Sequence, residues 1–211
     1  MFEYSLLHWA TFLSTAFLLT ISPGPDLAFI LGQTITSGRK SGFAAMLGIW
    51  GGTLGHIVMA VIGLSALIAA SSLAFTAIKW VGVGYFIWLG LNALRAVESL
   101  FSPDIQEEQK TVGRIFWRGA FTTLLNPKVA IFFLAFLPQF VVLGAGPTWA
   151  QLLLHGLLLI FVSALIEPLV VLSGDRIAAK LRDNKRVGLW LDRSLGAIFI
   201  ALGVRLAFET K

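Results

Sequence analysis

The chain has 211 residues, of which 57% are apolar and only 13% are charged. A soluble domain carries about 25% charged residues, so this chain has too few to cover a surface that faces water. Two stretches, 41–78 and 129–166, contain no Asp, Glu, Lys or Arg, and each is long enough for two membrane spans of about 20 residues. The composition therefore excludes a soluble protein and predicts an all-α polytopic membrane protein. The absence of cysteine excludes disulfides and thiolate metal sites.

Apolar runs predict six transmembrane helices, which leave no room for a separate soluble domain. In chain order we expect them at 6–36 (broken at 22–26), 42–65, 74–95, 118–142, 149–172 and 188–208. The second span is rich in glycine. Gly48 and Gly52, and likewise Gly51 and Gly55, are spaced as small-xxx-small pairs, which allow close contact with a neighbouring helix.

The two halves of the chain share features in the same order. Spans one and four each contain a proline break, and spans three and six carry the similar segments 86–90 (FIWLG) and 199–203 (FIALG). Because three crossings is an odd number, the second copy enters the membrane with the opposite polarity. The pattern predicts two inverted three-helix repeats, an architecture common in secondary transporters. The repeats are 1–97 and 118–211, and a polar cytoplasmic linker at 98–117 joins them.

Basic residues predict the orientation. Most Lys and Arg residues lie in the connectors after spans one, three and five, which the positive-inside rule therefore makes cytoplasmic, with both termini outside. We attribute the net charge of +5 to basic connectors, which orient the helices in the membrane and attract lipid headgroups. We expect no nucleic-acid partner. The connectors hold Arg39, Lys40, Arg95, Lys110, Arg114, Arg118, Arg176, Lys180, Arg182, Lys185, Arg186 and Arg193.

The first break is the sequence Ser22-Pro23-Gly24-Pro25-Asp26. Proline removes a backbone donor and glycine adds backbone entropy, so this segment is a poor choice for the interior of a helix. In lipid the freed backbone groups need partners inside the protein, which confines such a break to a buried or cavity-lining position. Asp26 has two readings: a functional carboxylate, or a residue that favours the positive N-terminus of the second half-helix.

The second break is the sequence Asn126-Pro127-Lys128. Asn126 makes a good cap and Pro127 a good first helical residue, but a cation just after them opposes the helix dipole. At a rise of about 1.5 Å per residue, Lys128 and Asp26 both lie about 15 Å deep, the middle of the bilayer core. Burying Lys128 costs about 2.5–3.5 kcal/mol. The alternative is that the Lys128 side chain snorkels to the membrane interface, which is far from the midplane.

The paired charges suggest a site for a zwitterionic amino acid. Lys128 and the half-helix N-termini would attract the carboxylate, while Asp26 and freed carbonyls would attract the ammonium. Two other residues have open roles. His56 lines the path or relays protons, or is a packed, hydrogen-bonded residue. Glu167, followed by Pro168, is a gate or proton site, or pairs with the basic connector.

Several segments together resemble the lysine-exporter superfamily, and more specifically its threonine and homoserine-type branch. They are Ser22-Pro23-Gly24-Pro25, Gly38-Arg39-Lys40-Ser41-Gly42, the segment 85–95, and Asn126-Pro127-Lys128 followed by Phe132-Phe133. The resemblance covers nearly the whole chain. It implies a bacterial or archaeal inner-membrane exporter of amino acids and related metabolites. It also implies a role for Pro23, Gly24, Pro25, Asn126, Pro127 and Lys128, and carries over to Asp26.

Two rival classes are a membrane-embedded lipid-modifying enzyme or protease and a small cation transporter. The sequence lacks H-E-x-x-H and G-x-S-x-G motifs, and its three histidines are scattered. Soft-metal ligands are nearly absent, because there is no cysteine and there are only three methionines. We therefore expect no enzyme activity, no metal site and no cofactor. The sequence leaves open the amino acid, proton antiport as against facilitated exit, and the oligomeric state, a homodimer included.

Overall fold

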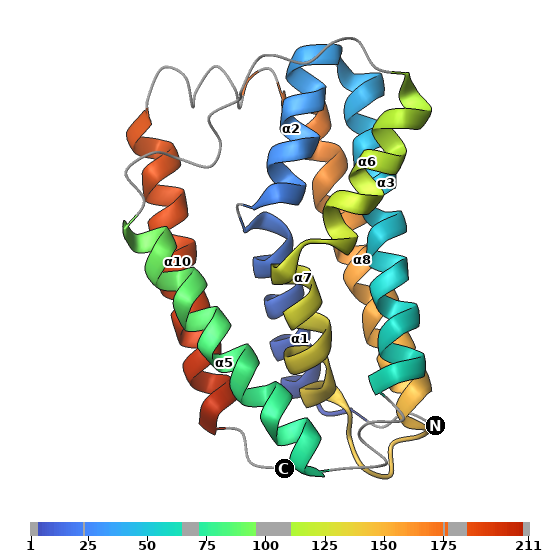
Figure 1. The fold of residues 1–211 in the computed structure, drawn as a ribbon, viewed down its shortest axis with the longest axis vertical. Coiled ribbons are helices and arrows are strands. Elements are labelled where there is room, and N and C mark those ends of the chain that lie inside the picture. The colour runs from blue at the N-terminus through green and yellow to red at the C-terminus, as the bar shows by residue number, and fades with distance from the viewer. Residues whose placement is uncertain are drawn as a thin grey trace.

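The computed structural model describes residues 4–22, 24–64, 72–95, 111–174, 176 and 185–208, and every regular element among them is helical. The chain runs back and forth between the two ends of the molecule in Figure 1. The prediction of an all-α protein is confirmed. The elements are α1 (Leu6–Ile21), α2 (Pro25–Ser37), α3 (Arg39–Met59) with η1 (Ala60–Leu64), α5 (Ser72–Arg95), α6 (Val112–Leu124), α7 (Pro127–Ile131), η2 (Phe132–Phe136), η3 (Leu137–Phe140), α8 (Thr148–Leu172) and α10 (Lys185–Phe208).

Three helices among the described residues are long and apolar enough to cross a membrane alone: Arg39–Leu64, Thr76–Arg95 and Thr148–Leu172. Two further spans form if each pair of helices joined at a break counts as one, which gives up to five. The apolar part of α10, Gly196–Phe208, is shorter. The chain is thus a multi-spanning membrane protein.

Both predicted helix breaks are present. α1 meets α2 at a bend of 49°, and α6 meets the segment Pro127–Phe140 at the same angle of 49°. Pro25 and Pro127 each occupy the start of the helix that follows, where a missing N–H costs nothing. Beyond its break the second pair continues through a π turn and a 3₁₀ turn, η2 and η3.

The largest boundary error lies at span four. We expected it to begin at residue 118, but α6 begins at Val112. Arg114 and Arg118 led us to place the membrane edge there, and a helix continues past that edge into the basic region. The linker residues 98–110 lie outside the described residues.

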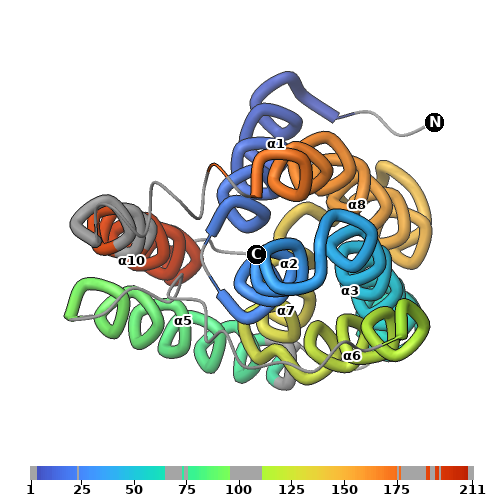
Figure 2. Tube along the Cα trace, turned by 90° about the horizontal axis from the view of Figure 1, so that it is seen from above, coloured from blue at the N-terminus to red at the C-terminus, as the bar shows by residue number. Residues whose placement is uncertain are grey.

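Glycines bring two helix pairs into backbone contact. On α3, a Cβ at Gly48 would collide with the Phe116 carbonyl of α6, and one at Gly52 would lie 2.5 Å from the Ala120 oxygen. The predicted small-xxx-small contact at this pair is confirmed. α5 and α10 cross where Gly90 and Gly196 meet, and they form a separate pair beside the other helices (Figures 1 and 2).

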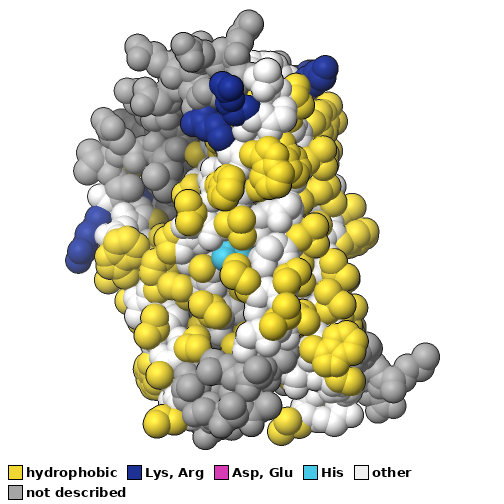
Figure 3. Space-filling model, turned by 45° about the vertical axis from the view of Figure 1, so that its right-hand side comes forward, with side chains coloured by type: hydrophobic (Ala, Val, Ile, Leu, Met, Phe, Trp, Pro, Cys, Tyr) yellow, Lys and Arg dark blue, Asp and Glu magenta, His cyan; other side chains and the backbone are white. Residues whose placement is uncertain are grey.

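The surface is apolar along its flanks. In Figure 3, hydrophobic side chains cover most of the visible middle, and Lys and Arg side chains gather near the upper end. Trp117, Phe161, Leu165 and Leu169 are each more than half exposed. Such a surface is stable in lipid and would associate in water.

Candidate functional site

The two helix breaks touch each other through two hydrogen bonds, both donated by the second break and accepted by the first. Lys128 Nζ donates to the backbone oxygen of Ser22 at 3.2 Å, and Asn126 Nδ2 donates to Asp26 Oδ1 at 3.1 Å. Each break therefore contributes a partner to the other. Polar groups that a broken helix leaves inside a membrane are satisfied here by the second broken helix.

Local sequence explains how Lys128 is held. The Asn126 side chain caps α7 by accepting from the backbone N–H of Lys128 at 3.0 Å. Gly24 leaves the space for the ammonium, because a Cβ at this position would lie 2.9 Å from Lys128 Nζ. Gly24 has an extended backbone with φ of 173°, so this glycine provides room and no special conformation.

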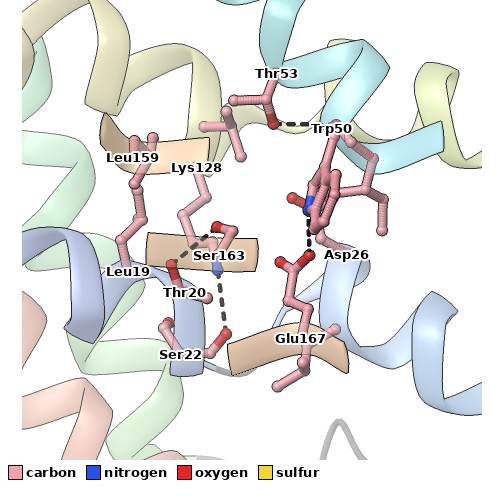
Figure 4. A pocket seen from close by; sticks show the side chains of 13 residues that line it. Leu19, Thr20, Ser22, Asp26, Trp50, Thr53, Lys128, Leu159, Ser163 and Glu167 are labelled. Atoms are coloured by element: carbon pink, nitrogen blue, oxygen red, sulfur yellow. Dashed lines mark hydrogen bonds between the residues drawn. The ribbon is translucent and has the colours of Figure 1, made fainter. Parts of the chain in front are cut away.

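A small cavity lies against both breaks. Its volume is about 40 Å³, enough for a few water molecules and too small for an amino acid. Figure 4 shows the charged and hydroxyl side chains directed toward it from α1, α2, α3, α7 and α8. The lining residues are Leu19, Thr20, Ser22, Asp26, Leu27, Ile49, Trp50, Thr53, Lys128, Val129, Leu159, Ser163 and Glu167.

Three ionisable side chains share this cavity. Lys128 and Glu167 are each 5% exposed, and Asp26 is partly buried. Asp26 and Lys128 make no ion pair within 4.0 Å; each is bound instead to a neutral group of the opposite break. Isolated buried charges are costly in a membrane interior and mark functional positions.

Glu167 lies on the face of α8 that meets the cavity. Its Oε2 accepts a hydrogen bond of 2.6 Å from Trp50 Nε1 on α3. One turn earlier on α8, the Ser163 hydroxyl lies 3.1 Å from Thr20 Oγ1 on α1. Thr20 donates to the Ala16 carbonyl at 2.8 Å, so Ser163 is the donor in this pair and keeps its own acceptor sites open.

Other predicted residues have different positions. Pro25 and Pro127 are exposed and set the starts of α2 and α7 without lining the cavity. Pro23 lies outside the described residues. His56 is buried away from the cavity, where its Nε2 lies 3.0 Å from the Thr123 carbonyl and its ring stacks on Phe133.

The prediction that the histidines are scattered is wrong for two of them. His8 on α1 and His155 on α8 lie with their Nε2 atoms 2.8 Å apart, although 147 residues separate them. Phe12 and Phe140 pack against the His155 ring. The pair ties α1 to α8 near the start of both helices.

Sequence reasoning did not single out Trp50, Thr20 or Ser163. One signal was available: Ser163 and Glu167 are four residues apart, so they share a helix face. Trp50 and Thr20 give no comparable signal, because the rotation of α3 and α1 toward the cavity depends on packing against α6 and α8.

The fold and the cavity together define a multi-spanning membrane protein with a polar site between two broken helices, an arrangement found in secondary transporters. The chain belongs to the LysE type translocator family, whose sequence model matches residues 17–210. It is therefore a membrane transporter of the efflux type and not an enzyme.

Curated relatives cover nearly the full length. The chain is 33% identical over 204 residues to a homoserine/homoserine lactone efflux protein of Salmonella typhimurium, which covers 94% of this chain and 95% of the relative. A protein of the same description from Salmonella typhi is 33% identical, with the same coverage. An uncharacterized membrane protein of Pseudomonas aeruginosa is 31% identical over 206 residues, covering 96% of this chain and 95% of the relative. No solved structure matches the chain significantly.

Proposed function

We propose that the protein exports a small neutral amino acid, or a derivative in which the carboxyl group is uncharged, with homoserine and homoserine lactone as the first candidates. The observation that carries the proposal is the hydrogen-bonded contact of the two breaks beside a cavity that holds Asp26, Lys128 and Glu167. A zwitterion needs groups of both charges within a few ångströms, and this cavity has them. The efflux relatives support the direction and substrate class.

We infer alternating access around this cavity. At about 40 Å³ the space is nearly closed, so a substrate enters only after helices or side chains move. In transporters with inverted repeats, such movement is a rocking of one repeat against the other around a fixed site.

The helix contacts support two inverted three-helix repeats with α10 as the sixth span. If the two halves of the chain are exchanged, α1 and α2 correspond to the elements from α6 through α7 and η2 to η3. In the same exchange α3 corresponds to α8, and α5 to α10. Under that exchange the contact of α1 with α8 becomes the contact of α6 with α3, and both exist. The contact of α2 with α3 likewise becomes that of η3 with α8, and α5 packs on α10. Phe86 and Phe199, which are equivalent under the exchange, stack with centroids 5.9 Å apart.

The proposed location is the inner membrane, with the connectors after spans one, three and five in the cytoplasm. The start of α3, with Arg39 and Lys40, and the start of α6, with Arg114, lie at the upper end of Figure 1. By the positive-inside rule, this end faces the cytoplasm. The beginning of α1 and the end of α10 lie at the opposite end, which is the outer side.

Counterflow of labelled homoserine and its lactone into proteoliposomes tests the proposal. The wild-type protein is expected to exchange both probes at rates well above protein-free vesicles. A panel of other amino acids, a divalent cation and a labelled phospholipid in the same vesicles examines the rival classes. Cation flux or lipid turnover without amino-acid exchange would contradict the proposed function. An imposed pH gradient distinguishes proton exchange from facilitated exit.

A further inference from the structure

The strongest unassigned feature is the pairing of Trp50 with Glu167 across the cavity from Lys128. α3 and α8 supply this pair, whereas the two breaks supply the hydrogen bonds that join them to each other. Figure 4 shows the Glu167 carboxyl and the Trp50 indole together on one side, with Lys128, Ser163 and Ser22 on the other.

Glu167 has an open acceptor site. A carboxylate offers about four lone-pair positions, and among the described residues the Trp50 indole is its hydrogen-bond donor. The second oxygen, Oε1, accepts from no described residue. A carboxyl that is 5% exposed and only partly satisfied gains most from a cationic or N–H donor brought into the cavity.

The helix geometry aims this carboxyl at the cavity. Pro168 follows Glu167 inside α8 and has no N–H to donate to the Ala164 carbonyl one turn earlier. Trp50 then fixes the carboxyl by a short bond to Oε2 and leaves Oε1 on the open side. The indole is a rigid donor, so it positions the carboxylate without supplying a charge of its own.

The cavity therefore has two chemically different sides. Lys128, on the Ser22 side, is the cation available to a substrate carboxylate. Glu167, with Asp26 nearby, is the acceptor available to a substrate ammonium. Asp26 and Glu167 each accept one side-chain hydrogen bond, from Asn126 and Trp50, and Glu167 is the more deeply buried of the two carboxyls.

We propose that the Trp50-held Glu167 binds the ammonium group of the substrate, and that Lys128 separately binds its carboxylate. This inference rests on the proposed function. It follows that transport of a substrate without a carboxylate depends on Glu167 and much less on Lys128. The chemical class accepted at Glu167 is a primary ammonium on a small carbon chain, whether the carboxyl is free, esterified or closed into a lactone.

The test compares two probes, homoserine and homoserine lactone, in proteoliposomes at one and the same pH. Glu167→Gln keeps the shape and the Trp50 contact while removing the charge, and is expected to lower transport of both probes at least tenfold. Lys128→Met is expected to lower homoserine transport at least tenfold more than lactone transport. Trp50→Phe keeps the ring and removes the donor, so it is expected to raise KM for both probes with little change in kcat.

Thermal unfolding in detergent and the amount of inserted protein are measured for each variant, and Glu167→Asp provides a second, charge-retaining change. Partial recovery of transport in Glu167→Asp relative to Glu167→Gln supports a charge role. Equal losses of transport for both probes in Lys128→Met, or full transport by Glu167→Gln, would overturn the separate roles of Glu167 and Lys128. A wild-type protein that moves neither probe contradicts the proposed function itself, so the two failures are distinguishable.

Discussion

The two helix breaks share a bend angle and have opposite chemistry. Both bend by 49° and both place a proline at the start of the following helix. The first contributes a carboxylate, Asp26, and a carbonyl, Ser22; the second contributes an amide, Asn126, and an ammonium, Lys128. The two bends thus bring the breaks together, and their differing side chains give the site a direction. A site with such polarity suits a substrate that has two unlike ends.

Removing the cation of the second break should have the largest effect. In Lys128→Ala the cavity keeps two carboxyls and loses its ammonium, so we expect homoserine export to fall about 30-fold or more, equivalent to about 2 kcal/mol. Efflux from loaded vesicles measures it. Lys79→Ala is the matched control, because Lys79 bonds to the Ala207 carbonyl far from the breaks. Equal export by both variants would contradict the role of Lys128.

Filling the space on the first break should have the next largest effect. Gly24→Ala places a methyl group 2.9 Å from Lys128 Nζ and displaces the ammonium from the Ser22 carbonyl. Losing one charge-assisted hydrogen bond costs about 1.5 kcal/mol, so export should fall about tenfold. Gly32→Ala on α2 is the control, because no atom lies within 4 Å of its added Cβ. If both glycine variants export normally, the fit between Gly24 and Lys128 is unimportant.

Asn126 has two roles, the cap of α7 and the hydrogen bond to Asp26, and two substitutions separate them. Asn126→Ala loses the cap of α7, at a cost of about 0.5–2 kcal/mol, and the hydrogen bond to Asp26. Asn126→Ser restores a cap without the amide donor. We therefore expect thermal stability in detergent to drop in the alanine variant and recover in the serine variant. Export should fall about fivefold in both, since one hydrogen bond contributes about 1 kcal/mol. Full recovery of export with serine would assign Asn126 to capping alone.

Replacing the proline of the second break should have the smallest effect. Pro127 is exposed and lines no part of the cavity, and Asn126 still caps the helix without it. Pro127→Ala should therefore change export less than about twofold and stability by no more than about 0.5 kcal/mol. Counterflow and thermal unfolding measure these changes. A large loss would mean that the proline itself sets the bend.

Sequence predicted the parts of the site that depend on local chemistry. Proline and glycine mark the breaks, Asn126 marks a cap, and counting residues placed Asp26 and Lys128 at one depth, where the structure brings the two breaks together. Sequence could not predict which faces of α3 and α8 meet the cavity, because the apolar positions of both helices show little periodicity. Trp50 was missed for that reason, whereas Ser163 could have been found from its four-residue spacing to Glu167. The pairing of His8 with His155 was missed because it depends on long-range packing.

The central claim is that substrate binds in the cavity between the two breaks. The chain has no cysteine, so Ser163→Cys introduces a single thiol in the cavity wall. The most direct measurement is the rate at which a small membrane-permeant thiol reagent labels this cysteine, with and without homoserine or its lactone. Thr111→Cys at the exposed start of α6, away from the cavity, is the control. We predict that the substrate slows labelling at position 163 at least several-fold and leaves position 111 unchanged. Labelling of Ser163→Cys that substrate does not slow, in a variant that still exports it, would contradict the claim.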